Sequence, residues 1–300
     1  MNIVNSNNDI WIIGYGDIGR RLGKLYQKEG IQACVTVRSK QSLQAAKKEG
    51  KKGYQLDLDM KNVLSFPTDI NNAKLFYFVP PQREGRKDTR IDRFLRQVSA
   101  QKNKLKHIVL ISTTGVYGNC NGDWVNETRM ITPHVDRAQR RADAEQQLID
   151  WANQNKCQYV ILRVPGIYAK DRLPITRLEK GLAVVRESES PWTNRIHADD
   201  LAMICYQAME QMRQGKISGE ILNVSDGTPS TMTSYFNSVA DYAGLSRPPQ
   251  ISLKQAEKEL SEGMMSYMKE SRRISNKKML EKLSIQLIYP SLMHCLKKST

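Results

Sequence analysis

Short runs of apolar, often β-branched residues alternate with amphipathic stretches through the first two thirds of the chain. The runs that predict strands are DIWIIG, QACVTV, YQLDL, LFYFV, HIVLIS and YVILRV, and helical patterns lie between most of them. Strands that alternate with helices in this way are typical of a parallel sheet covered on both faces. A further run, EILNVSD at 220–226, predicts a strand that returns to the same sheet after a helix at 198–214.

The remaining segments differ in composition. Residues 171–193 and 227–300 are richer in Pro, Met and short helical patterns, and they lack buried-strand runs. We therefore expect a doubly wound α/β fold in two interleaved parts. Residues 1–170 and 194–226 would form the sheet domain, and residues 171–193 and 227–300 would form a smaller C-terminal α+β lobe.

The first apolar run ends in a glycine-rich turn, IWIIGYGDIGRRLGKLY, with the spacing GxGxxG. A strand precedes the turn and an amphipathic helix follows it, which is the context of a dinucleotide-binding turn. Its glycines permit the tight turn, the approach of a pyrophosphate and close packing of helix on strand. The alternative is a glycine-rich turn without a ligand. The predicted site comprises Gly14, Gly16, Asp17, Ile18, Gly19 and, after the LFYFV run, Val79 and Pro80.

The second run ends in Arg38, Ser39 and Lys40, at the point where a site for NAD(H) would carry an acidic residue for the adenosine ribose. A guanidinium can bind a 2′-phosphate through charge-assisted hydrogen bonds of about 1.5–3 kcal/mol each. These residues favour NADP(H) as the cofactor, with NAD(H) or a merely solvent-facing basic loop as alternatives. Asp57, in YQLDLDM at the end of the third predicted strand, is expected near the adenine edge.

Hydroxyl groups gather at the end of HIVLISTTGVYG, where the carboxyl end of a parallel strand would border the ligand crevice. The segments LRVPGIYAKDR, NRIHADDLA, LNVSDGTPST and SRRISNKKML follow in order. With the glycine turn, these segments resemble the extended short-chain dehydrogenases/reductases, the superfamily of sugar-nucleotide epimerases and dehydratases. The resemblance spans nearly the whole chain and implies a Rossmann-type fold that binds NAD(P).

The resemblance also identifies a catalytic helix in PHVDRAQRRADAEQQL at 133–148. Thr113 matches the family's catalytic Ser/Thr, and Glu145 matches the glutamate that aligns the family's lysine. The YxxxK pair of the family then falls on Arg137 and Arg141. In the family the tyrosine moves a proton during hydride transfer, whereas an arginine, with a pKa above about 12, does not. No tyrosine of this chain has a lysine four residues later.

Two interpretations of the arginine pair remain. Arg137 and Arg141 would hold the nicotinamide ribose or an anionic group of the substrate, or they would belong to an exposed basic face, as Arg140 beside them suggests. Tyr117 is the phenol left near the predicted crevice and is a candidate proton donor together with Thr113. The candidate catalytic residues are therefore Thr113, Tyr117, Arg137 and Arg141.

The formal charge of +15 favours a phosphorylated or otherwise anionic ligand. Nucleic acid is less favoured as a partner, because no aromatic-interleaved RNA motif accompanies the basic residues.

Membrane spans need roughly 20 apolar residues, and no run approaches this length. The first residues lack a secretory pattern, which favours the cytoplasm. Five scattered cysteines without CxxC spacing predict buried free thiols, and neither the cysteines nor the histidines have metal-ligand spacing.

These features predict an atypical NADP(H)-dependent oxidoreductase or epimerase/dehydratase-like protein that acts on a phosphorylated or sugar-nucleotide-like substrate. The alternative is a non-catalytic NADP(H) sensor, which would explain the missing pair directly. Extended family members often dimerise through the helices that correspond to 90–101 and 133–148. Because both helices are highly charged here, we expect a monomer rather than a dimer.

Overall fold

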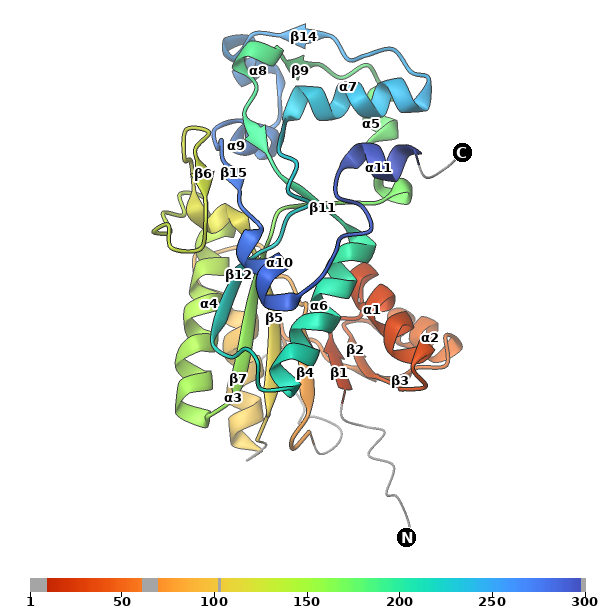
Figure 1. Ribbon diagram of the computed structural model, residues 1–300, viewed down its shortest axis with the longest axis vertical. Coiled ribbons are helices and arrows are strands. Elements are labelled where there is room, and N and C mark those ends of the chain that lie inside the picture. The colour runs from red at the N-terminus through yellow and green to blue at the C-terminus, as the bar shows by residue number, and fades with distance from the viewer. Residues whose placement is uncertain (1–9, 61–69, 102–103, 298–300) are drawn as a thin grey trace.

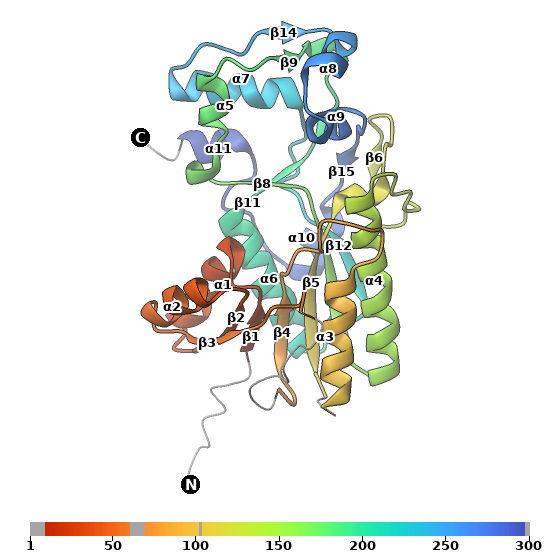
Figure 2. The same ribbon diagram turned by 180° about the vertical axis from the view of Figure 1, so that it is seen from behind.

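The computed structural model describes residues 10–60, 70–101 and 104–297. At its centre lies a seven-stranded sheet in the order β12-β7-β5-β4-β1-β2-β3, and all its strands run parallel (Figures 1 and 2). Its strands are β1 (Ile10–Ile13), β2 (Cys34–Val37), β3 (Lys52–Gln55), β4 (Lys74–Tyr77), β5 (His107–Thr113), β7 (Gln158–Val164) and β12 (Glu220–Asn223).

Helices cover both faces of this sheet, because successive strand residues point to opposite sides. In β1, Ile10 and Ile12 belong to one core, whereas Trp11 and Ile13 belong to the other. The first core is closed by α1 (Asp17–Lys28), α2 (Lys40–Lys48), α6 (Ala198–Arg213) and α10 (Lys277–Leu283). The second core is closed by α3 (Thr89–Ala100) and α4 (Asp136–Asn155).

The strand order reverses next to β1. The chain runs from β1 through β2 to β3 on one side and then continues with β4 on the other side of β1. In open parallel sheets, ligands bind beyond the carboxyl ends of the strands at such a switch point. The glycine turn after β1 and the residues after β4 therefore lie at the position expected for a ligand.

A smaller lobe lies beyond the carboxyl edge of the sheet (Figure 1). Its helices pack around two apolar clusters of their own. Its elements are α5 (Ile175–Glu179), β9 (Val184–Val185), β10 (Trp192–Thr193), β13 (Ser230–Thr231), α7 (Met232–Ala243), β14 (Gln250–Ile251), α8 (Leu253–Glu259), α9 (Glu262–Met268) and α11 (Leu292–Lys297).

Two short strand pairs join the lobe to the sheet domain. In the first, β8 (Gly166–Tyr168) pairs with β11 (Arg195–His197). In the second, β6 (Trp124–Val125) pairs with β15 (Arg273–Ile274), which brings the C-terminal part of the chain back to the sheet domain.

The doubly wound α/β fold predicted from the sequence is confirmed, and so is the late return of the chain to the sheet as β12. The proposed domain boundary needs one change, because Met279 and Leu283 of α10 pack into the first core of the sheet domain.

The interpretation of Arg140 as a solvent-facing residue is wrong: it is 6% exposed and donates to the Gly85 carbonyl at 2.5 Å. All five cysteines are buried and unbridged. No helix within the described ranges is long and apolar enough to span a bilayer.

Candidate functional site

The glycine turn has the backbone geometry of a phosphate cradle. Gly14 has a φ of +95°, and a Cβ there would lie 3.0 Å from the Val79 backbone nitrogen. At Gly19 a Cβ would lie 3.1 Å from the Gly14 carbonyl oxygen. At Gly16, in contrast, a Cβ would meet nothing within 4 Å. The fold therefore needs the first and third glycines for packing, and it leaves open space over the second.

Helix α1 begins at this turn and directs its free N–H groups toward that space. Gly16 is the N-cap without a side-chain hydrogen bond, and the first helical bond joins the Arg20 N–H to the Gly16 carbonyl at 2.9 Å. A helix N-terminus of this kind favours an anion. The Asp17 carboxylate is bound to Arg21 at 3.0 Å and Arg172 at 2.8 Å, so Asp17 offers only its backbone N–H to a ligand. The turn thus fits the pyrophosphate of a dinucleotide.

Basic residues follow the neighbouring strand β2. The side chain of Arg38 is 69% exposed, and its only ion pair in the described structure is a loose one of 4.0 Å with Asp59. Ser39 caps α2 by accepting a hydrogen bond from the Ser42 N–H at 3.1 Å, and Lys40 is the first residue of that helix. Asp57 accepts a hydrogen bond from the Asp59 N–H at 3.0 Å. The Arg38 guanidinium is therefore free to bind another anion.

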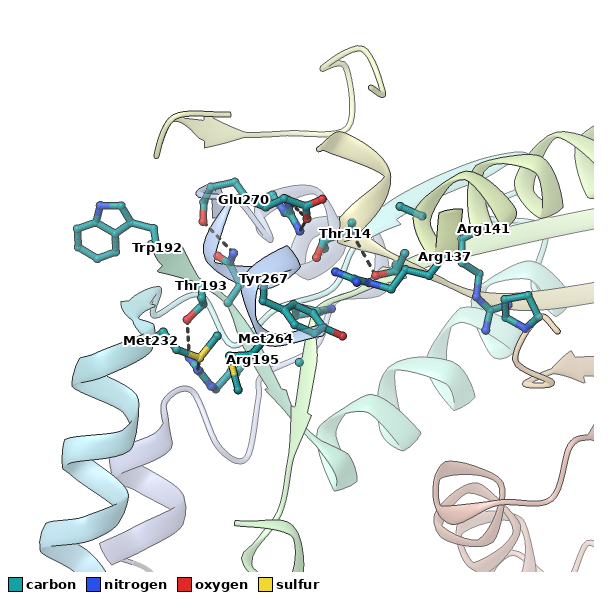
Figure 3. A pocket seen from close by; sticks show the side chains of 18 residues that line it. Thr114, Arg137, Arg141, Trp192, Thr193, Arg195, Met232, Met264, Tyr267 and Glu270 are labelled. Atoms are coloured by element: carbon teal, nitrogen blue, oxygen red, sulfur yellow. Dashed lines mark hydrogen bonds and ion pairs between the residues drawn. The ribbon is translucent and has the colours of Figure 1, made fainter. Parts of the chain in front are cut away.

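A cavity of about 510 Å³ lies between α4, the end of β5 and the smaller lobe (Figure 3). It brings together three of the predicted catalytic residues, Thr113, Arg137 and Arg141. The other lining residues are Pro81, Thr114, Gly115, Ala138, Pro165, Gly166, Trp192, Thr193, Asn194, Arg195, Met232, Met264, Tyr267, Glu270 and Arg272.

Arg141 projects from α4 toward the residues that follow β4 (Figure 3). Its only hydrogen bond in the described structure is a long one, 3.3 Å, to the Val79 carbonyl, and no described carboxylate forms an ion pair with it. Burial lowers the pKa of this guanidinium, and the charge of Asp88 only partly opposes that effect. A half-buried charge with only one long hydrogen bond costs free energy, so an anion or several acceptor oxygens in the cavity would stabilise Arg141.

Arg137, one helical turn earlier, connects α4 to the smaller lobe. It donates to the Ser266 hydroxyl at 2.6 Å, and its guanidinium lies 4.2 Å from the centre of the Tyr267 ring. Neither contact neutralises its charge. The alternative of an exposed basic face therefore does not describe this pair, because both arginines line the cavity.

Two more arginines come from the smaller lobe and its connection. Arg195 is 9% exposed, stacks on Tyr235 at 3.5 Å and donates to the Thr193 hydroxyl at 2.8 Å. Burial lowers its pKa, and no described carboxylate forms an ion pair with it. Arg272 is different, because it pairs with Glu270 at 3.0 Å. The cavity wall thus carries four arginines and one glutamate, which makes it strongly positive.

Asp226 lies just after β12. Its charge acts on Arg195 through space, but the two side chains form no ion pair. Burial raises the pKa of its carboxyl from 3.8 to about 7, although the Thr228 N–H donates to it at 3.0 Å. Because the folded pKa lies above the unfolded value, Asp226 contributes stability below about pH 4 that is lost as the pH rises through about 7.

We therefore expect Asp226→Asn to be more stable than the parent at pH 8, by up to about 4 kcal/mol, and nearly equal to it at pH 4. Asparagine keeps the acceptor for Thr228 but cannot ionise. Urea unfolding of both proteins at the two pH values measures the difference. Equal differences at both pH values would mean that the carboxyl ionises in its ordinary range.

Tyr117 does not reach the cavity, so its predicted role as proton donor loses its geometric basis. It is 1% exposed, and its hydroxyl donates to Asn223 at 2.8 Å and accepts from Arg163 at 2.9 Å. Burial raises the pKa of this phenol. Arg163 in turn pairs with Glu145 at 2.7 Å inside the domain. Tyr117 and Glu145 thus belong to a buried network that supports the end of β5.

The sequence patterns missed the part of the site that comes from the smaller lobe. Tyr267 and Glu270 lie about 130 residues after Arg137 and share no motif with it. Arg195 stands inside the NRIHADDLA segment, which resembles the family's pattern, but the pattern alone did not assign it a ligand role. The unpaired charge of Arg195 becomes apparent only from its surroundings in the fold.

Comparisons with known proteins agree with this architecture. A family model described as NAD(P)H-binding matches residues 14–212. A functionally unknown conserved protein from Silicibacter pomeroyi shares 24% identity, with a TM-score of 0.82 and 96% of each chain covered. A UDP-glucose 4-epimerase from Thermotoga maritima, solved with UDP-glucose, shares 18% identity, with a TM-score of 0.72 and coverage of 97% of this chain and 96% of that one.

A UDP-glucose 4-epimerase from Brucella ovis, solved with NAD, shares 15% identity, with a TM-score of 0.69 and coverage of 97% of this chain and 96% of that one. A search of curated proteins gives no significant match. The matched region begins at Gly14 and covers about two thirds of the chain, and it contains the glycine turn, the arginine pair and Arg195. The chain therefore belongs to the NAD(P)H-binding family, and its fold is that of the two UDP-glucose 4-epimerases.

Proposed function

We propose that the protein binds NADP(H) at the switch point between β1 and β4 and an anionic substrate in the neighbouring cavity, and that it acts as an atypical oxidoreductase or epimerase/dehydratase-like enzyme. One observation carries this proposal. A single cavity joins Thr113, the match to the family's catalytic hydroxyl, to Arg137, Arg141 and Arg195, which have no carboxylate partner among the described residues. Such a wall attracts phosphates or carboxylates.

The residues of the glycine turn would hold the pyrophosphate of the cofactor, and the residues that follow β2 would hold its adenosine ribose. The N–H groups of Asp17, Ile18 and Gly19 would bind the pyrophosphate, and Arg38 and Lys40 would bind the 2′-phosphate of NADP(H). The half-exposed Asp57, beyond β3, would border the adenine, and Val79 and Pro80 would border the turn. The bound nicotinamide would supply or accept a hydride.

The cavity residues would bind and orient rather than move a proton. The Thr113 hydroxyl accepts from the Gly115 N–H at 3.1 Å, which leaves its own O–H to donate to a substrate oxygen. Arg141 takes the place of the family's lysine and would reach both the nicotinamide ribose and, together with Arg137, an anionic group of the substrate. Arg137 takes the place of the tyrosine and would hold an anionic group of the substrate, since a guanidinium does not donate its proton near pH 7.

The replacement of the family's YxxxK pair by Arg137 and Arg141 also favours a second function. Tyr117 is sequestered and the pair on α4 is basic, so a dinucleotide sensor without catalysis is consistent with the geometry. The two functions differ in one measurement. Oxidation of NADPH with any member of a carbonyl panel, above the rate without protein, supports the enzyme, and binding of NADPH without turnover on the whole panel supports the sensor.

Exchange of the arginine pair for the family's residues tests the roles given to α4. We expect Arg137→Tyr with Arg141→Lys to weaken binding of NADPH or of inorganic phosphate about tenfold, because two guanidinium forks are replaced by one phenol and one ammonium. Titration calorimetry measures both affinities. Arg96→Lys on α3, where the side chain is exposed, is the control. Unchanged affinities in the double variant would show that neither arginine touches these ligands.

A further inference from the structure

The cavity that we propose as the substrate site has donors in abundance and few acceptors. The one side-chain amide of the lining belongs to Asn194, and both of its polar atoms already have partners. Its Nδ2 donates to the Arg272 carbonyl at 3.0 Å, and its Oδ1 accepts from the Ile274 N–H at 2.7 Å. The carboxylate of the lining, Glu270, accepts two hydrogen bonds of 3.0 Å from Arg272 through one oxygen. The other oxygen has no hydrogen-bond partner in the described structure, but it is buried away from the cavity surface. No described side chain of the lining therefore exposes a carboxylate or amide oxygen that is free to accept.

This inventory does not suit a sugar. Each sugar hydroxyl donates as well as accepts, and a donor that loses water without finding an acceptor costs free energy. The remaining side-chain oxygen acceptors of the lining are hydroxyls, and Thr193 already donates to the Ser230 carbonyl at 2.9 Å and accepts from Arg195. Only the hydroxyls of Thr113, Thr114 and Tyr267 then remain, among the side-chain oxygens of the lining, to accept hydrogen bonds from the several hydroxyl groups of a sugar ring.

The rest of the lining is apolar. Met232 and Met264 are partly exposed, and Tyr267 on α9 is 51% exposed, with the Arg137 guanidinium 4.2 Å from its ring centre. In Figure 3 the two thioethers lie on one side, Arg137 and Arg141 lie on the other, and Tyr267 lies between them. Methionine side chains adapt to ligands of irregular shape, and an accessible aromatic ring offers a stacking surface. The cavity is therefore polarised into a cationic wall on α4 and an apolar wall of Met232, Met264 and Tyr267 in the smaller lobe, beside which Arg195 donates to the Met232 thioether at 3.6 Å.

From this arrangement we propose that the substrate is an amphipathic anion, with one phosphate or carboxylate on an aromatic or aliphatic body, rather than a glycosyl compound. The inference rests on the anionic substrate of the proposed function and narrows its class. The anionic group lies against Arg137 and Arg141, and the apolar body lies against Met232, Met264 and Tyr267. The reactive carbon then lies near Thr113, between the two walls.

Three probes with the same charged group separate the two substrate classes: phenyl phosphate, glucose 1-phosphate and inorganic phosphate. We expect the full-length protein to bind phenyl phosphate at least about tenfold more tightly than glucose 1-phosphate in titration calorimetry, because the phenyl ring buries apolar area that the sugar does not. Met264→Gln should reduce that ratio at least about threefold by adding a polar group to the apolar wall. Met130→Gln, at a residue 77% exposed outside the cavity, should leave the ratio unchanged.

Arg141→Met distinguishes failure of this inference from failure of the proposed function. Weaker binding of all three probes by this variant supports the anion site. If glucose 1-phosphate binds as tightly as phenyl phosphate and the binding depends on Arg141, the anionic site stands and the amphipathic class is overturned. If no probe binds, or if Arg141→Met changes none of the affinities, both the inference and the anionic part of the proposed function are overturned.

Discussion

Replacement of Gly16 with valine is expected to weaken NADPH binding by at least about a hundredfold, equivalent to about 2.7 kcal/mol, without unfolding the protein. The isopropyl group would enter the open space over the turn, where the pyrophosphate has to approach the α1 N–H groups. Because a Cβ at this residue meets no atom within 4 Å, the folded structure accommodates the change. Equilibrium titration of NADPH, with thermal unfolding of the same samples, measures both effects.

Gly14→Val is the matched comparison, because it places the same side chain two residues away. Its Cβ would lie 3.0 Å from the Val79 backbone nitrogen at a φ of +95°, so this variant should lose stability as well as binding. A Gly16→Val protein that is folded and binds NADPH like the parent would show that the turn is only structural.

The second large effect concerns the choice between the two cofactors. Arg38→Asp should reverse the preference, with NADPH affinity falling by more than about tenfold and NADH becoming the tighter ligand. The carboxylate would repel the 2′-phosphate and could accept hydrogen bonds from the ribose hydroxyls of NADH. Separate titrations with NADPH and NADH measure the ratio.

Lys48→Asp changes the net charge by the same amount at the far end of α2, where the residue is exposed. It should leave the ratio of the two affinities unchanged, since only a residue near the 2′-phosphate distinguishes the cofactors. If Arg38→Asp behaves like Lys48→Asp, Arg38 does not contact the nucleotide.

Local patterns sufficed for the sheet, for the glycine turn between strand and helix and for the position of Arg137 and Arg141 on one helix, because each depends on spacing within one strand, turn or helix. The third strand was displaced, since β3 spans Lys52–Gln55 rather than the run YQLDL, although Asp57 follows the strand as expected. Tyr117 and Arg140 were misinterpreted for a common reason. Their environments depend on partners far along the chain, Asn223 for the first and Gly85 for the second, and no local pattern encodes such contacts.

The smaller lobe was the hardest part to predict. Its strands have two residues each, and its helices other than α7 have only five to seven residues, so periodicity carries little information there. Yet Met232, Met264 and Tyr267 from this lobe form the apolar wall of the cavity. The sequence therefore located the glycine turn at the end of β1 but not the smaller-lobe residues that line the cavity.

Titration of the unmodified protein with NADPH and NADH, after purification without added nucleotide, tests the central claim most directly. The account predicts that both cofactors bind and that NADPH binds at least about tenfold more tightly, because Arg38 and Lys40 stand at the 2′-phosphate end of the site. Equal dissociation constants would contradict the assignment of NADP(H). Absence of binding by either nucleotide at millimolar concentration would contradict the account as a whole.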